Sequence, residues 1–268
     1  MSTGLYEAIV FGPIISRRLG HSLGVNLLPQ HGKWCNFNCI YCECGWNEEH
    51  TEDKVLPDAA AVKAALEHKL QSLKEAGESI DTITFSGNGE PTLNPHFPEI
   101  IDNTIELRNR YFPNAVISVL SNATRIHIKE VREALMKVNN PILKIDSPDP
   151  AVVDAINKPA EGYSLERVIE NMRLFKGNFI LQTMFLKGEC DGTAIDCTNP
   201  ELCRRWSELA LSLRPRMIMM YTLDRETPAK NLSIVTIEEM EEIAAPLRKE
   251  GMELQIKGPS RERRQDII

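Results

Sequence analysis

The sequence has no apolar run long enough to cross a bilayer. Its longest runs, such as residues 115–120 and 217–221, have the length of β-strands, whereas a membrane-spanning helix needs about 20 apolar residues. The first residues, MSTGLYEAIVFGP, have neither a charged first segment nor a long apolar segment. They do not resemble a secretory signal, so we expect a cytoplasmic protein that does not enter a membrane.

An excess of basic residues is also lacking. The chain has 31 Lys and Arg residues against 38 Asp and Glu residues, which gives a formal net charge of −7. Proteins that bind nucleic acid usually present a broad basic face to the phosphates. The charge therefore does not favour nucleic acid as a partner.

Internal repeats, low-complexity segments and linkers are absent from the sequence as well. The length of 268 residues is long for one domain and short for two, but an α/β barrel fills such a length as a single unit. We predict one domain over residues 1–268. It would consist of an N-terminal extension (1–22), a barrel core (23–225) and a C-terminal helix and strand (226–268).

The cysteines do not have the pattern of a disulfide framework. There are seven of them, an odd number, and four lie within ten residues in the segment KWCNFNCIYCECG (33–45). Thiolates at this density suit zinc or an iron–sulfur cluster. A structural zinc site usually takes two cysteine pairs a dozen or more residues apart. Three thiols in a C-x3-C-x2-C loop would leave one coordination position open, which is typical of a reactive centre.

Strand-like and helix-like segments alternate along the rest of the chain. Near-continuous apolar strands that alternate with helices predict an α/β fold, with a parallel sheet covered by helices on both faces. Each strand ends in polar or small residues, and ligands bind at the carboxyl ends of such strands. The predicted strands are 23–29, 81–87, 115–122, 141–147, 178–186, 215–223 and 252–258, and the predicted helices are 57–76, 95–111, 127–137, 164–176, 199–213 and 236–250.

The cysteine spacing resembles the signature of the radical S-adenosylmethionine (SAM) enzymes. Cys35, Cys39 and Cys42 have the spacing of that family, and Tyr41 is the aromatic residue before the last cysteine. The resemblance implies that these three cysteines bind a [4Fe–4S] cluster whose fourth iron is chelated by SAM. It also implies a partial (β/α)6 barrel of the TIM type with the helices outside. A structural zinc knuckle is the alternative for these residues, and Cys44 would be a thiol near the cluster.

Polar residues at the strand ends extend this resemblance. The segment Gly87-Asn88-Gly89-Glu90-Pro91 is similar to the family's Gly-Gly-Glu element, with an asparagine between the glycines. Glycines there would permit a positive φ and a close approach of the backbone to the SAM ammonium group. By the resemblance, we expect contacts to the cofactor or the substrate from Tyr41, Gly87, Gly89, Glu90, Ser121, Asn122, Asp146 and Gln182.

Other segments are similar to a branch related to the tRNA wyosine-base synthases, which is Fe–S oxidoreductase-like. They include FSGNGEPTLNP (85–95), KIDSPD (144–149), INKP (156–159) and YTLDRETP (221–228). The family resemblance implies that SAM is split reductively and that a 5′-deoxyadenosyl radical abstracts a hydrogen atom from the substrate. It also implies a flavodoxin or ferredoxin as the electron donor.

Several alternatives remain open at this point. The acidic charge favours a small molecule or a peptide as the substrate over a tRNA or nucleoside. An iron–sulfur electron carrier without SAM chemistry is a further possibility. Cys190, Cys197 and Cys203 could bind a second cluster or be inert thiols, and Arg225 could contact the substrate or the SAM carboxylate. The sequence identifies neither the substrate nor the oligomeric state, and it does not say whether SAM is regenerated.

Overall fold

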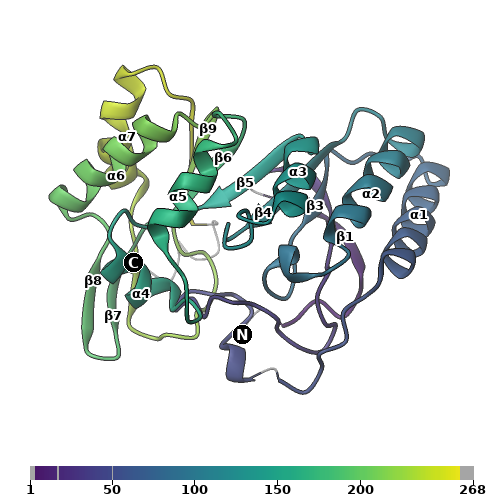
Figure 1. Cartoon of the computed structure of the whole chain (residues 1–268), viewed down its shortest axis with the longest axis horizontal. Coiled ribbons are helices and arrows are strands. Elements are labelled where there is room, and N and C mark those ends of the chain that lie inside the picture. Colours follow the sequence, from purple (N-terminus) through teal and green to yellow (C-terminus); the bar gives the residue numbers. More distant parts are fainter. Residues whose placement is uncertain (1–3, 17, 50, 260–268) are drawn as a thin grey trace. The chain divides into compact units, whose positions relative to one another are not determined.

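The fold is built on a mostly parallel sheet of eight strands in the computed structural model, which describes residues 4–16, 18–49 and 51–259 (Figure 1). The α/β class with a parallel sheet, predicted from the alternation of segments, is therefore confirmed. Across the sheet the strands follow the order β1 (Val10–Ser16), β2 (Gly20–Val25), β3 (Thr82–Phe85), β4 (Val116–Ser121), β5 (Asn140–Lys144), β6 (Ile180–Met184), β9 (Met217–Tyr221) and β11 (Leu254–Lys257).

The chain divides into two compact units. Among the described residues, the N-terminal unit comprises those of 5–36 and 47–142, and the C-terminal unit comprises Gly4 and those of 37–46 and 143–259. The cysteine loop therefore contributes to both, and each unit is described by itself below.

In the N-terminal unit, three helices accompany strands β1 to β4. They are α1 (Ala59–Glu75), α2 (Phe97–Tyr111) and α3 (Lys129–Lys137), and they lie side by side in Figure 1. Helix α1 starts at Asp58, whose side chain accepts a hydrogen bond from the N–H of Ala61, as expected of an N-cap. Its buried residues recur at helical spacing (Val62, Leu66, Leu70 and Leu73) and form the apolar stripe that faces the core.

In the C-terminal unit, strands β6, β9 and β11 pair in parallel. The helices of this unit are α4 (Pro150–Asn157), α5 (Leu165–Arg173), α6 (Pro200–Leu213) and α7 (Ile237–Lys249). Trp206 of α6 is among the largest fully buried side chains, and its indole N–H donates to the hydroxyl of Thr183 on β6. Because successive side chains of a strand point to opposite faces, Gln182 and Met184 lie on the face of β6 opposite to α6.

A second, antiparallel sheet also belongs to the C-terminal unit. It consists of β10 (Leu232–Ile234), β7 (Leu186–Cys190) and β8 (Thr193–Asp196), in that order. Asp191 and Gly192 join β7 to β8 with φ values of 52° and 76°. Two successive positive φ values are the signature of a type I′ hairpin turn, in which Asp-Gly is a favoured pair.

Most elements predicted from the sequence are present at nearly the predicted positions. All seven predicted strands and all six predicted helices are found, and β1 pairs antiparallel with β2 at the edge of the sheet. Helix α4 and the second sheet were not predicted. Short 3₁₀ helices at Asn47–Glu49 and Pro91–Leu93 complete the secondary structure of the described residues.

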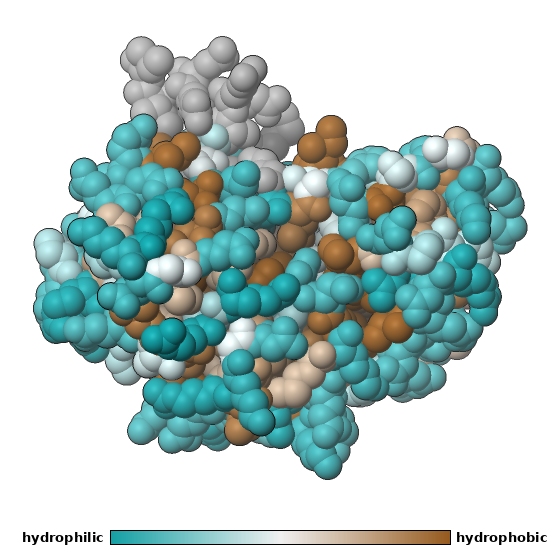
Figure 2. Space-filling model, turned by 90° about the horizontal axis from the view of Figure 1, so that it is seen from above, coloured by the Kyte–Doolittle hydropathy of each residue, from teal (hydrophilic) through white to brown (hydrophobic). Residues whose placement is uncertain are grey.

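Large exposed hydrophobic residues are few in the part of the chain that the structure describes: Ile14, Ile15, Trp34, Val55 and Leu174. Figure 2 shows one face of the molecule, on which hydrophilic residues form most of the surface and hydrophobic residues show in patches between them. No helix among the described residues combines the length and the apolar character that spanning a membrane requires.

Candidate functional site

The start of the cysteine loop is tied to the glycine turn that follows β3. The N–H of Trp34 donates to the carbonyl of Asn88 (2.9 Å), and the N–H of Glu90 donates to the carbonyl of Trp34 (3.1 Å). Trp34 and Gly89 thus form an isolated β-bridge next to Cys35. The first predicted cluster ligand therefore follows directly on a backbone pairing with the predicted Gly-Asn-Gly-Glu element.

The two glycines of this turn are required by the chain's own packing. Gly89 has a φ of 138°, and a Cβ atom there would lie 2.0 Å from the carbonyl oxygen of Trp34. A Cβ atom at Gly87 would lie 2.3 Å from the side-chain oxygen of Asn26. The absence of side chains at these positions lets the turn pack closely on the cysteine loop and on Asn26, and the carbonyl of Asn88 accepts a hydrogen bond from Trp34.

Asn88, which stands between these glycines, is completely buried and has a structural role. Its side-chain amide donates to the carbonyls of Pro29 (2.7 Å) and Tyr6 (3.0 Å), and its side-chain oxygen accepts from the N–H of Tyr6 (2.8 Å). Asn88, which interrupts the Gly-Gly pair of the family's element, therefore supplies a buried amide that links the segments of Tyr6 and Pro29 in the N-terminal unit.

Glu90 joins the glycine turn to the end of β4. Its carboxylate is 2% exposed and accepts from the hydroxyl of Ser121 (2.8 Å) and the N–H of Asn122 (2.6 Å), as well as from Thr92. Burial raises the pKa of Glu90, although these donors partly oppose the shift. Three residues predicted for the cofactor site thus meet, with the carboxylate at the centre.

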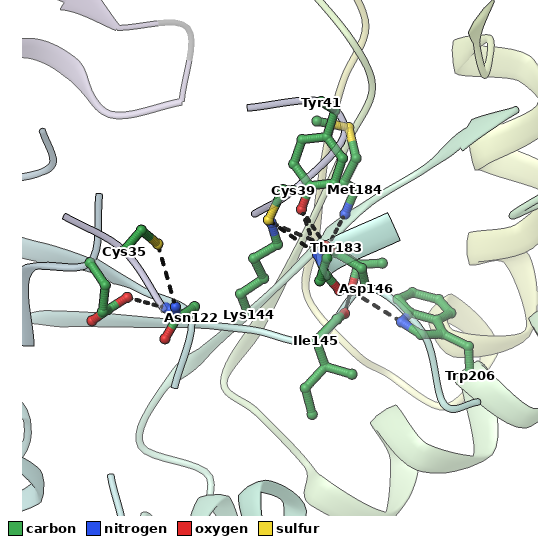
Figure 3. Close-up of polar contacts among 12 residues, drawn as sticks. Cys35, Cys39, Tyr41, Asn122, Lys144, Ile145, Asp146, Thr183, Met184 and Trp206 are labelled. Atoms are coloured by element: carbon green, nitrogen blue, oxygen red, sulfur yellow. Dashed lines mark hydrogen bonds and ion pairs between the residues drawn. The ribbon is translucent and has the colours of Figure 1, made fainter. Parts of the chain in front are cut away.

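Asn122 connects this cluster to the first cysteine. Its Nδ2 lies 3.9 Å from Sγ of Cys35 and donates to the side-chain oxygen of Asn36 (2.8 Å), as Figure 3 shows for Asn122 and Cys35. The amide of Asn36 in turn donates to the hydroxyl of Thr124 (2.6 Å). An N–H group is therefore directed at the sulfur atom of Cys35.

In the C-terminal unit, the remainder of the loop is anchored on Asp146. This carboxylate is buried and accepts from the hydroxyl of Tyr41, from Nδ2 of Asn157 (2.6 Å) and from the N–H of Met184 (2.9 Å). Nζ of Lys144 forms an ion pair with it at 3.0 Å. Four donors thus surround Asp146, and one of them is the predicted loop residue Tyr41.

Cys39 lies next to this network and is itself buried. Nδ2 of Asn157 is 3.5 Å from its sulfur atom, so the two N–H groups of one amide can serve both Asp146 and Cys39. Burial raises the pKa of the Cys39 thiol, whereas Lys144 and the Asn157 hydrogen bond act in the opposite direction. Cys42, the third predicted ligand, is partly exposed.

Gln182 carries an amide nitrogen that is buried without a hydrogen-bond partner among the described residues. The residue is 5% exposed and lies in β6 opposite Met219 of β9. Buried polar groups are nearly always hydrogen-bonded, so such a group calls for an explanation. A bound ligand that accepts a hydrogen bond would provide one.

Two residues of this site were missed in the sequence. Lys144 precedes Asp146 by two positions at the end of β5, and the alternation of strand side chains would have placed both on one face. Asn157 lies in the segment INKP, which carried part of the resemblance but no assigned role. The sequence therefore contained a signal for Lys144 and for Asn157. Their contact with Tyr41 could not be read from it, because Tyr41 lies more than a hundred residues away along the chain.

The later cysteines have different surroundings. Cys190 ends β7, Cys197 follows β8, and Cys203 in α6 donates to the carbonyl of Cys197 (3.4 Å). Burial raises the pKa of Cys197 to about 12 and that of Cys203 to about 11. Arg225 forms an ion pair with Glu43 of the cysteine loop (2.8 Å), and both side chains are about half exposed.

The donor groups at Cys35 and Cys39 fit an iron–sulfur cluster. Hydrogen bonds to the cysteine sulfurs are among the factors that set cluster potentials, and an amide N–H faces each of these two sulfurs. Within the described residues, no three His, Cys, Asp or Glu side chains form a group that would hold a single metal ion. The thiolates of a cluster each bind a different iron, so they do not have to converge on one point.

A sequence model of the Radical SAM superfamily matches residues 30–197, which is more than half of the chain. The chain belongs to the radical SAM superfamily. A [4Fe–4S] cluster and SAM are the cofactors that this family implies, and the matched region contains the cysteine loop and both networks described above. The resemblance stated on Cys35, Cys39 and Cys42 is confirmed at the level of the superfamily.

Several curated relatives of this radical SAM chain are UPF0026 proteins. One from Helicobacter pylori is 31% identical over 189 residues, which are 68% of this chain and 58% of that protein. One from Methanocaldococcus jannaschii is 32% identical over 183 residues, which are 66% of this chain and 54% of that protein. The chain spans between 32% and 64% of the length of the curated relatives that it matches.

Solved structures show the fold. A radical SAM methyltransferase from Sphaerobacter thermophilus superimposes with a TM-score of 0.64 at 16% identity and covers 88% of this chain and 66% of that one. Streptococcus suis SuiB bound to SAM gives a TM-score of 0.61 at 14% identity, over 85% of this chain and 49% of that one. The common element is the partial TIM-type barrel of radical SAM proteins, as predicted.

Proposed function

We propose that this chain is a radical SAM enzyme in which Cys35, Cys39 and Cys42 bind a [4Fe–4S] cluster. The observation that carries the proposal is the C-x3-C-x2-C loop inside the matched region, with an amide N–H directed at two of its three sulfurs. When bound, a reduced cluster would supply the electron for the reductive cleavage of SAM, and the radical chemistry that the family implies would remove a hydrogen atom from the substrate.

The candidate residues divide into supports and contacts in this proposal. Gly87 and Gly89 let the turn pack against the loop and against Asn26, while Glu90 holds Ser121 and the backbone of Asn122. Asp146 fixes Tyr41 through its hydroxyl. All of these groups already pack against or hydrogen-bond to other parts of the chain, so we propose that they hold the cysteine loop and the strand ends in place.

Gln182 is the residue that we assign to direct contact with a ligand. Its buried amide nitrogen has no hydrogen-bond partner among the residues of the described ranges. It would donate a hydrogen bond to an oxygen or nitrogen acceptor of SAM or of the substrate, and a buried donor gains most when it is satisfied.

For the substrate we favour a small molecule or a peptide, supported by the net charge of −7, with a flavodoxin or ferredoxin as electron donor. A tRNA- or nucleoside-modifying activity, in the branch related to the wyosine-base synthases, is the alternative. A second cluster on Cys190, Cys197 and Cys203 is not part of the proposal, because their spacing, with six and then five residues between them, matches no cluster motif and the sequence identifies no fourth ligand.

The test is anaerobic reconstitution with iron and sulfide, followed by dithionite and SAM. We expect about four irons per chain, as in one [4Fe–4S] cluster, and formation of 5′-deoxyadenosine. Cys35→Ala should lose both, whereas Cys44→Ala, a substitution in the same loop, should retain both. Bound iron without 5′-deoxyadenosine, unaffected by Cys35→Ala, would indicate an electron carrier. A colourless protein that holds zinc would refute the cluster.

A further inference from the structure

Lys144 carries a largely buried cation that packs against Tyr41 of the cysteine loop. Its side chain is 13% exposed, and Nζ lies 3.0 Å from Oδ2 of Asp146 and 4.2 Å from the centroid of the Tyr41 ring (Figure 3). Burial lowers the pKa of Lys144, but the charge of Asp146, with contributions from Tyr221 and Cys39, outweighs it and holds the pKa above its ordinary value. The side chain therefore carries its charge at neutral pH.

The ion pair lies next to Cys39. Nδ2 of Asn157 contacts both Oδ2 of Asp146 (2.6 Å), which is the partner of Lys144, and Sγ of Cys39 (3.5 Å). The cation and the sulfur therefore share one neighbouring amide. The carboxylate of Asp146 accepts hydrogen bonds from Tyr41, from Asn157 and from the N–H of Met184, and these donors partly offset its negative charge.

A fixed cation beside a sulfur ligand affects the redox balance of a cluster. Reduction adds one negative charge, and a nearby cation in a poorly solvated site stabilises the reduced form. The groups around the ligands thus set the potential as much as the ligands do.

We propose that Lys144 raises the reduction potential of the cluster that Cys39 helps to bind, and that Asp146 and Tyr41 are positioning residues for this cation. The inference rests on the proposed function, since it requires a cluster on Cys35, Cys39 and Cys42. Its consequence is that an electron-donor protein reduces the cluster more readily by one electron.

The chain provides a matched control in Lys158. Nζ of Lys158 lies 5.1 Å from the centroid of the ring of Trp46, the residue that follows the cysteine loop. The lysine side chain is 33% exposed, and its partner Asp191 is 76% exposed. Water screens such a pair, so its removal should not move the potential.

The experiment is a redox titration of the reconstituted protein without SAM, in which electron paramagnetic resonance measures the reduced cluster. For Lys144→Met we expect an about tenfold lower ratio of reduced to oxidised cluster at a given potential, which is about 59 mV for one electron. Lys158→Met should titrate as the unmodified protein does. The double variant Lys144→Met/Asp146→Asn, which leaves no buried charge without a partner, should lie between Lys144→Met and the unmodified protein.

The outcomes separate this inference from the proposed function. If the unmodified protein binds no cluster, the proposed function itself is wrong. If the cluster forms and Lys144→Met and the double variant both titrate as the unmodified protein does, only the role of Lys144 is refuted. A weaker affinity for SAM in Lys144→Met, with an unchanged potential, would likewise refute it and make Lys144 a SAM contact. If Lys144→Met does not fold, the double variant decides.

Discussion

The cysteine loop and the later cysteines differ in the groups that surround their thiols, and this difference is the basis on which we propose a ligand site in the loop alone. At Cys39 a buried lysine and an amide both favour the thiolate against the effect of burial. At Cys203 burial and the carboxylate of Asp196 both disfavour it. Both regions lie near turns that contain glycine, but amide N–H groups are directed at the sulfurs of Cys35 and Cys39, whereas Cys203 itself donates to a carbonyl.

The largest effect that separates the two regions concerns their glycines. In Gly89→Ala the new Cβ atom would lie 2.0 Å from the carbonyl oxygen of Trp34, at a φ of 138°. We expect the free energy of unfolding to fall by about 2–5 kcal/mol, because strain and overpacking add. In Gly192→Ala of the β7–β8 hairpin the Cβ atom would meet nothing within 4 Å. Only the cost of a left-handed alanine remains, about 1–2 kcal/mol.

Urea unfolding of the protein without iron measures both values. Equal losses in Gly89→Ala and Gly192→Ala would contradict the close packing of the cysteine loop on the glycine turn.

A smaller effect concerns the reactivity of Cys203. With its pKa raised from 9.0 to about 11, the thiolate fraction near neutral pH should be about a hundredfold below that of an ordinary thiol, since each pKa unit is a factor of ten. Alkylation by iodoacetamide, followed by peptide mass spectrometry, should therefore be slow and accelerate as the pH rises toward 11.

The same pKa shift makes the contribution of Cys203 to stability depend on pH. Because the pKa is raised in the folded state, the contribution is complete below about pH 9 and is lost as the pH rises toward 11. If Cys203 of the folded protein were alkylated rapidly at neutral pH, its thiol would not have the raised pKa on which both predictions rest.

Much of the fold followed from the sequence because its signals are local. Apolar strands such as residues 115–122 and helices with capping residues such as Asp58 depend on neighbours in the chain. The hairpin at Asp191-Gly192 also had a local signal, an Asp-Gly pair, but residues 187–198 belong to no predicted strand or helix. Helix α4 is only eight residues long and gives little periodicity to detect.

The site was only partly predictable, because its decisive contacts join distant segments. The cysteines and Glu90, Ser121 and Asn122 were recognised from motifs at strand ends. Their connections were not, since Asn122 reaches Cys35 across 87 positions and Tyr41 reaches Asp146 across 105. The sequence predicts which residue types gather at an edge of a sheet, whereas the partner of each depends on the packing of the whole unit.

The most direct test of this comparison is electron paramagnetic resonance of the reduced protein with and without SAM, in Cys39→Ala and Cys197→Ala. We expect Cys197→Ala to keep the signal of a reduced [4Fe–4S] cluster, and we expect SAM to change the shape of that signal. Cys39→Ala should show neither the signal nor the change. A SAM-sensitive signal that survives in Cys39→Ala and is lost in Cys197→Ala would contradict the assignment of the cluster to the cysteine loop.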